Sequence, residues 1–136
     1  MGSRRKAREC ALQLLYQGEF SPTVAGGNGP WTSFEEDSML PSAEVRTFAE
    51  ELVQGVLSNE AAIDERIRSV STNWKLERMA LVDRNILRIA AYELMYRTEI
   101  PRKVSLNEAI EIAKRFGTED SSSFINGILD KIAGAE

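Results

Sequence analysis

Histidine is absent from this 136-residue sequence, and cysteine occurs once, at position 10. The chain therefore lacks the commonest general base and the commonest metal ligand. With a single thiol and no imidazole, a structural zinc site is excluded. Cys10 cannot form an internal disulfide, which agrees with a reducing cytoplasm. Its apolar neighbours at helical spacing predict a small buried thiol rather than a reactive one.

Long hydrophobic runs are also missing. No apolar stretch approaches the roughly 20 residues that cross a bilayer, and no hydrophobic segment follows the basic N-terminus as in a secretory signal. We therefore expect a cytoplasmic protein that does not enter a membrane. The content of 43% hydrophobic and 28% charged residues is typical of a soluble globular protein. The length suits one domain.

Catalytic motifs are scarce as well. The sequence has no GxGxxG or phosphate-binding glycine pattern, and no nucleophile lies near a recognisable base. Three consecutive carboxylates at 35–37 are more simply a solvated acidic patch than a metal cage. We expect neither an enzyme nor a cofactor.

Charge is unevenly distributed along the chain. The net charge is −4, but four cations within the first eight residues contribute +4, which leaves −8 for the other side chains. These cations are Arg4, Arg5, Lys6 and Arg8. A compact basic arm on an acidic body is expected where a chain holds an anionic partner. The alternative is a frayed basic terminus that serves only solubility.

Apolar residues recur at helical spacing along most of the chain, and almost no period-two stretch is present. The pattern predicts an all-α protein with six to seven helices. The central helix follows Met79 and stops near Glu99, because Pro101 disfavours a helical residue before it. The other expected helices span about 3–18, 42–57, 59–70 and 106–116, with a last one after 118–123 and a short turn at 74–79. Residues 19–42, rich in glycine and proline, form a long surface loop.

Local signals indicate where the helices begin and end. Ser3 and Ser42 are candidate N-caps. Residues 105–108 (SLNE) have the pattern of a capping box, in which Ser105 opens the next helix. Gly117 suits a left-handed exit from that helix. On the central helix, Arg88 is expected to extend to solvent.

Three features are candidates for binding. The first is the basic arm, which suits phosphates. The second is the serine run at 121–123, where free helix amides could accept a phosphate, although plain capping is favoured because Glu119 and Asp120 would repel an anion. The third is the aromatic pair Phe116 and Phe124, which flank the same turn and have core spacing, yet either could stack on a base. Asp83 lies near the start of the central helix. Its negative charge either interacts favourably with the positive end of the helix dipole or faces a partner.

An ordered set of sequence blocks resembles one family closely, the NusB transcription antitermination factors. The blocks cover the chain except loop 19–42. They are 8–13 (RECALQ), 15–16 (LY), 52–56 (LVQGV), 82–94 (VDRNILRIAAYEL), 100–109 (IPRKVSLNEA), 116–121 (FGTEDS) and 124–131 (FINGILDK).

The resemblance implies a single domain over 1–136, a helical bundle in two packed halves at about 3–72 and 73–136. It also implies binding of boxA single-stranded RNA in ribosomal RNA leader transcripts, together with the small-subunit ribosomal protein NusE. The complex, with other Nus factors, helps RNA polymerase read through terminators. By similarity the basic arm holds RNA phosphates and the turn with Phe116, Asp120, Ser121 and Phe124 lies against the strand. The positions that face NusE in the family are Tyr16, Glu77 and Asp83.

One position departs from the family pattern. Members often carry a lysine before the Phe-Ile/Val-Asn-Gly run, whereas this chain has Ser123, so one phosphate contact is missing there. Two other hypotheses are a purely structural dimerisation module and a fragment of an RNA methyltransferase with a NusB-like N-terminal domain. The lack of a cofactor-binding βαβ pattern argues against the second. The sequence does not distinguish a monomer from a homodimer.

Overall fold

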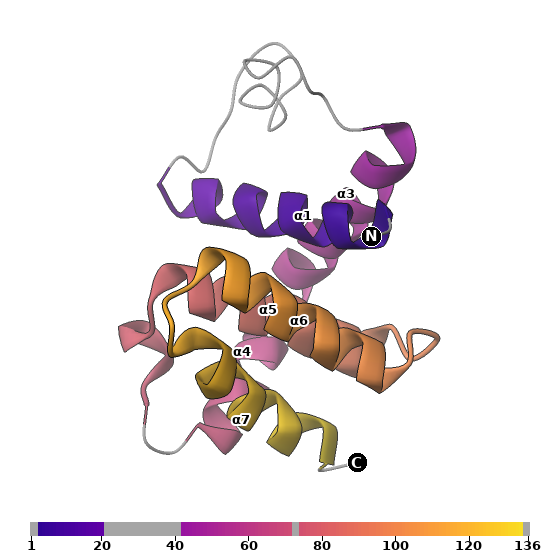
Figure 1. Ribbon diagram of the computed structural model, residues 1–136. Helices are drawn as coiled ribbons and strands as arrows, with labels where there is room; N and C mark the ends of the chain where they lie inside the picture. The colour runs from indigo at the N-terminus through magenta and orange to yellow at the C-terminus, as the bar shows by residue number, and fades with distance from the viewer. Residues whose placement is uncertain (1–2, 21–41, 72–73, 135–136) are drawn as a thin grey trace. The chain divides into compact units, whose positions relative to one another are not determined.

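A computed structural model describes residues 3–20, 42–71 and 74–134 (Figure 1). Every regular element in these ranges is helical, which confirms the expected all-α class. The elements are α1 (Ser3–Phe20), α3 (Ala43–Ser58), α4 (Glu60–Val70), a 3-10 turn η2 (Leu76–Arg78), α5 (Leu81–Tyr96), α6 (Arg102–Phe116) and α7 (Ser121–Gly134). The first helix runs two residues past the predicted Gly18. Most of the expected loop, residues 21–41, lies outside the described ranges.

The chain divides into two compact units, Met1–Val53 and Gln54–Glu136. Within the described part, the first unit contains α1 and most of α3, and the second contains the remaining elements. The expected halves, about 3–72 and 73–136, remain a prediction. None of the helices described is long and apolar enough to span a membrane. The same residues contain no cluster of three potential metal-ligating side chains.

The N-terminal unit is built from small and aliphatic side chains of α1 and from the apolar stripe of α3. Ala7, Cys10 and Ala11 are buried, and burial raises the pKa of the Cys10 thiol, as expected for an unreactive core cysteine. Ser42 caps α3 as predicted, because its Oγ accepts a hydrogen bond from the Val45 amide at 3.3 Å. Ser3 is itself helical, so the cap predicted there is wrong.

Helix α5 is the centre of the C-terminal unit. It packs against α4, α6 and α7 (Figure 1), and nine of its residues between 85 and 94 are buried. This confirms the prediction from its two apolar faces. The helix ends at Tyr96, earlier than the predicted Glu99, and the chain turns at once, with the Ile100 amide donating to the Arg97 carbonyl at 2.9 Å.

The capping box predicted at 105–108 is wrong. Helix α6 begins four residues earlier than predicted, at Arg102, with Pro101 as its N-cap. Ser105 lies inside the helix, is 2% exposed, and donates its hydroxyl to Glu93 Oε1 at 2.7 Å. Glu93 on α5 is equally buried, and a buried carboxylate requires a donor. The tertiary contact with Glu93 therefore determines what this serine does.

The left-handed exit predicted at Gly117 is also wrong. Gly117 ends α6 in an extended conformation, with φ −95° and ψ −167°, which other residues also adopt. The glycine is required for space, because a Cβ atom there would collide with the side chain of Ser121. This close approach brings the start of α7 against the end of α6.

Candidate RNA- and protein-binding sites

Basic side chains cluster on the first turn of α1, which itself carries no acidic residue. Arg4 and Lys6 are exposed and Arg5 is half-buried. The guanidinium carbon of Arg4 lies 4.0 Å from the centre of the Phe48 ring on α3, a cation–π contact. Three of the four predicted arm cations are thus at or near the surface of a helix, and one of them has an aromatic support.

Arg8 differs from its three neighbours. Only 4% of it is exposed, and its guanidinium carbon lies 5.6 Å from the centre of the same Phe48 ring. One helical turn separates Arg8 from Arg4, so both side chains follow the same face of α1. Arg8 therefore contributes to packing in the N-terminal unit, whatever it contributes to binding.

A shallow cavity of about 290 Å³ lies beside Arg4. Its lining includes Phe48 and two carboxylates of α3, Glu44 and Glu51. These carboxylates reduce the local positive potential next to Arg4.

The C-terminal unit contains a larger pocket, of about 530 Å³. Its wall combines the segment before α5 with the turn between α6 and α7. Among the lining residues are Trp74, Arg78, Asp83, Asp120, Ser121 and Phe124. A pocket of this volume with aromatic walls and a few polar groups is typical of ligand sites. Three of the predicted RNA-binding residues and one of the predicted NusE-binding residues thus lie in one cavity.

The turn that carries Asp120 is held by a hydrogen bond between its backbone and the side chain of Ser121. Ser121 Oγ accepts a hydrogen bond from the Thr118 amide at 2.9 Å, and Ser121 itself is 2% exposed. The buried hydroxyl is thus engaged in the turn before α7, and the capping of α7 by the serine run stays a prediction. The turn places Phe124 in the pocket wall, where its ring meets Trp74 edge-on, with centres 5.9 Å apart and an interplanar angle of 82°.

Asp83 is half-buried in the first turn of α5, at the edge of this pocket. Its Oδ1 atom is removed from solvent and has no hydrogen-bond partner among the residues that the structure describes. An unsatisfied buried carboxylate oxygen is costly. Proximity to the positive end of α5 offsets part of that cost.

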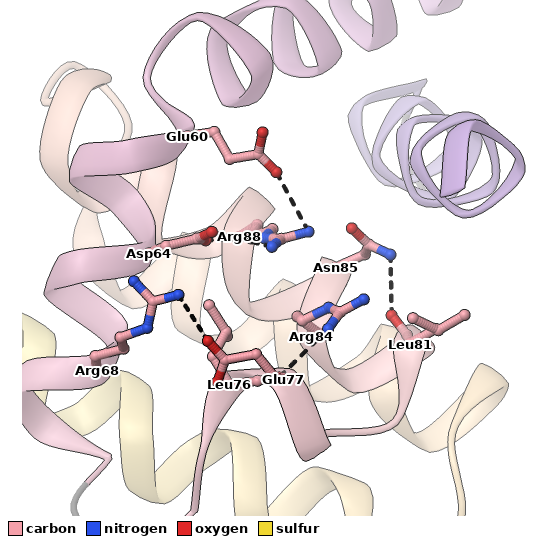
Figure 2. Close-up of polar contacts among 9 residues, drawn as sticks. All are labelled: Glu60, Asp64, Arg68, Leu76, Glu77, Leu81, Arg84, Asn85 and Arg88. Carbon is pink, nitrogen blue, oxygen red and sulfur yellow. Dashed lines mark hydrogen bonds and ion pairs between the residues drawn. The ribbon is translucent and has the colours of Figure 1, made fainter. Parts of the chain in front are cut away.

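A polar network joins α4, η2 and the start of α5 (Figure 2). Arg88 donates from Nε to Asp64 Oδ1 at 2.9 Å and from Nη2 to Oδ2 at 3.0 Å, and Nη1 lies 3.5 Å from Glu60 Oε2. The expectation that Arg88 extends to solvent is therefore wrong, because its side chain is only 12% exposed. A two-pronged pair of this kind orients both partners.

The remaining predicted partner residues lie apart from the pocket lining. Glu77 on η2 accepts from Arg68 Nη2 at 3.0 Å (Figure 2). The pKa of Glu77 lies below its ordinary value because its own backbone amide and the Arg68 guanidinium donate hydrogen bonds to the carboxylate. Tyr16 is 39% exposed on α1.

Phe116 is 44% exposed at the end of α6, outside the pocket lining, and the guanidinium carbon of Arg115 lies 5.2 Å from its ring centre. Of the aromatic pair singled out from the sequence, Phe116 is thus the exposed member and Phe124 the pocket member.

Sequence reasoning missed two residues of the pocket. Trp74 was expected only as part of an apolar connection, and Arg78 was not singled out. Trp74 is 58% exposed, an unusual exposure for so large an apolar side chain. No sequence signal pairs it with Phe124, fifty positions away, because that contact depends on how the segment before η2 packs on α7.

Together these observations define a class, a small all-helical protein whose cationic and aromatic side chains gather at surfaces suited to single-stranded RNA. Residues 5–134 match the model of the NusB family. The transcription antitermination protein NusB of Geobacter sulfurreducens is 52% identical over 134 residues, 98% of this chain and 95% of the relative. Its namesake in Myxococcus xanthus is 49% identical over 137 residues, 99% and 97% of the two chains. A solved structure of T. maritima NusB is 39% identical, with a TM-score of 0.80 over 96% of this chain and 90% of that one. The chain belongs to the NusB family.

Proposed function

We propose that this protein is a transcription antitermination factor that binds boxA-type single-stranded RNA of ribosomal RNA leader transcripts jointly with NusE. In this role it acts in the cytoplasm as an adaptor within the antitermination complex of RNA polymerase and other Nus factors. It binds without a cofactor and without catalysing a reaction. The observation that carries the proposal is the match to relatives named for transcription antitermination at about half identity over nearly the whole chain.

Two surfaces divide the work of RNA binding in this proposal. Arg4, Arg5 and Lys6 supply attraction to phosphates, which does not depend on the base sequence and weakens with salt. The pocket with Asp120 and Phe124 contacts unstacked bases, and Phe116 offers a further exposed ring. Arg8 adds to the phosphate contacts only when its guanidinium leaves the Phe48 ring.

The NusE surface in this proposal includes Tyr16, Glu77 and Asp83. The two carboxylates suit a basic ribosomal protein, because complementary charge favours the encounter and the correct orientation of the partners. Tyr16 provides an exposed aromatic contact, a residue type enriched at protein interfaces.

The test is equilibrium binding of the full chain to a boxA-type single-stranded RNA and to a scrambled RNA of the same composition, with and without NusE, at two salt concentrations. We expect a preference for boxA that strengthens when NusE is present. Equal, weak binding to both RNAs that NusE does not change would overturn the proposal and leave an all-helical protein with a basic first helix.

A further inference from the structure

We infer that Phe48 on α3 is a positioning residue for RNA binding. Its ring holds the guanidinium of Arg4 in place on the first turn of α1, with the N–H groups ready for a phosphate of the strand. This inference rests on the proposed RNA-binding role of the basic arm and deepens it. It adds a residue of a second helix to that surface, and it separates the role of Arg4 from that of Lys6, which contributes charge alone.

The Phe48 ring is a fixed support for Arg4. Phe48 is 6% exposed, and its neighbours Val45, Ala49 and Leu52 on the same helix are buried as well. The guanidinium carbon of Arg4 lies over this ring, 4.0 Å from its centre, well within the range of a cation–π contact. An exposed arginine otherwise samples many rotamers, and the ring restricts them before RNA arrives. Part of the entropy cost of ordering Arg4 on RNA is thus removed in the free protein.

The contact with the ring leaves the hydrogen-bond donors of Arg4 available. Phe48 meets the guanidinium through the face of its ring, and no carboxylate or carbonyl among the described residues pairs with that guanidinium. A guanidinium has five N–H donors in one plane, and two of them along one edge fit two phosphate oxygens. Arginine therefore combines stacking on an aromatic ring with paired hydrogen bonds to a phosphate, which lysine does not. Arg4 is exposed, so a strand reaches these donors from solvent.

The carboxylates beside Arg4 determine the side from which the strand approaches. Glu44 and Glu51 line the cavity of about 290 Å³ next to Arg4 and Phe48. Their negative charge keeps a phosphate out of the cavity itself and favours a cation over the ring. Both carboxylates are exposed, so water and salt screen them from a phosphate on the outer side. The phosphate contact is therefore at the solvent-facing edge of Arg4.

Lys6 provides the contrast within the same turn. It is exposed and makes no ring contact, hydrogen bond or ion pair with the residues that the structure describes. Its ammonium is a compact charge on a flexible stem, so it attracts a phosphate without a defined direction. Removing Lys6 thus measures the effect of charge alone, whereas removing Arg4 measures charge together with the support from Phe48.

A double-mutant cycle on the full chain tests this division. Binding to a boxA-type single-stranded RNA is measured by fluorescence anisotropy at one low salt concentration, without NusE. Arg4→Gln and Lys6→Gln are each introduced into the wild-type chain and into the Phe48→Leu variant. We expect the loss of affinity on Arg4→Gln to be about twofold to fivefold larger in the wild type than in Phe48→Leu, the scale of a cation–π contact at an exposed site. The loss on Lys6→Gln should be the same in both chains.

Two further variants separate the contact with Arg4 from the packing of the ring. Pentafluorophenylalanine placed at position 48 keeps the shape of the ring but reverses the charge distribution over its face, so the ring no longer attracts a cation. It should reproduce the result of Phe48→Leu, and it carries the test if that variant does not fold. Phe48→Tyr keeps an attracting face and should retain the larger loss on Arg4→Gln. Urea denaturation shows that each variant is folded before affinities are compared.

Each contrary outcome has a distinct meaning. If Arg4→Gln costs the same factor whichever side chain is at position 48, the inference is overturned while the basic arm remains an RNA surface. If Phe48→Leu reduces the effect of Lys6→Gln as much as that of Arg4→Gln, the ring only supports the helix, and the inference is also overturned. If neither Arg4→Gln nor Lys6→Gln weakens RNA binding in the wild type, the proposed role of the arm fails together with the inference.

Discussion

The first turn of α1 and the pocket beside α7 present charge in opposite ways. On α1, Arg4 and Lys6 are exposed, and Arg4 is supported on one side by an aromatic ring. In the pocket, Asp83 is half-buried, and no described residue donates a hydrogen bond to its Oδ1; it lies next to the turn that Ser121 holds and to the edge-on contact of Phe124 with Trp74.

This difference separates two kinds of recognition. Exposed cations on one helical turn attract any polyanion and do so less as salt rises. A partly buried acceptor beside aromatic rings discriminates by hydrogen-bond pattern, because a mismatched ligand leaves the acceptor unpaired. The charge of the first is local in the sequence, whereas the second requires segments distant in the chain to meet. Substitutions in the two regions should therefore change different measured quantities.

The largest expected effect lies in the ion pair between Arg88 and Asp64. Arg88→Ala removes the partner of Asp64, which is 9% exposed, and leaves a nearly buried charge uncompensated. We expect the free energy of unfolding to fall by about 3 kcal/mol. Urea denaturation measures this, with Lys131→Ala, an exposed cation of α7, as the matched control. If Arg88→Ala lowers the free energy of unfolding no more than Lys131→Ala does, the hydrogen bonds of the Asp64 carboxylate are made by water and not by Arg88.

A smaller change is expected from the basic turn, and it should appear in salt dependence rather than stability. Replacing Arg4, Arg5 and Lys6 with glutamine should reduce the slope of log affinity against log salt. For single-stranded RNA the reduction should be about 0.7 for each phosphate that the variant no longer neutralises. Fluorescence anisotropy at several salt concentrations measures the slope.

Because Arg8 is buried, the single variant Arg8→Gln is the comparison for that triple variant. It should lower the stability of the N-terminal unit, because the packing of Arg8 on Phe48 is removed, and change the salt slope less than the triple variant does. An unchanged slope in the triple variant would remove the turn from the RNA surface.

The smallest expected effect concerns pH and the exposed pair of Glu77 and Arg68. Because the folded-state pKa of Glu77 is lowered, the pair stabilises the fold above the unfolded-state pKa. That stabilisation is lost as pH falls through the folded-state pKa. Glu77→Gln should therefore reduce stability slightly at neutral pH and not at strongly acidic pH. Thermal melts across this range measure it, and a larger deficit at acidic pH than at neutral pH would contradict the assignment.

Much of the fold could be predicted because helical periodicity and some end signals are local. The central helix with its two apolar faces, the cap at Ser42 and the buried Cys10 all follow from residues within a turn or two of each other. The capping box at Ser105 failed although its motif is equally local. The Ser105 hydroxyl instead donates to Glu93, twelve positions away, because the buried carboxylate of Glu93 requires a donor.

The candidate site follows the same division. The basic first turn, the family blocks and the candidates Asp83, Asp120 and Phe124 could be recognised from residue type and spacing alone. The burial of Arg8 and Arg88, and the pocket that Trp74 and Arg78 share with those candidates, follow from how the helices pack. The physical reason is that burial and the satisfaction of polar atoms depend on which distant segments meet, and no local pattern records that.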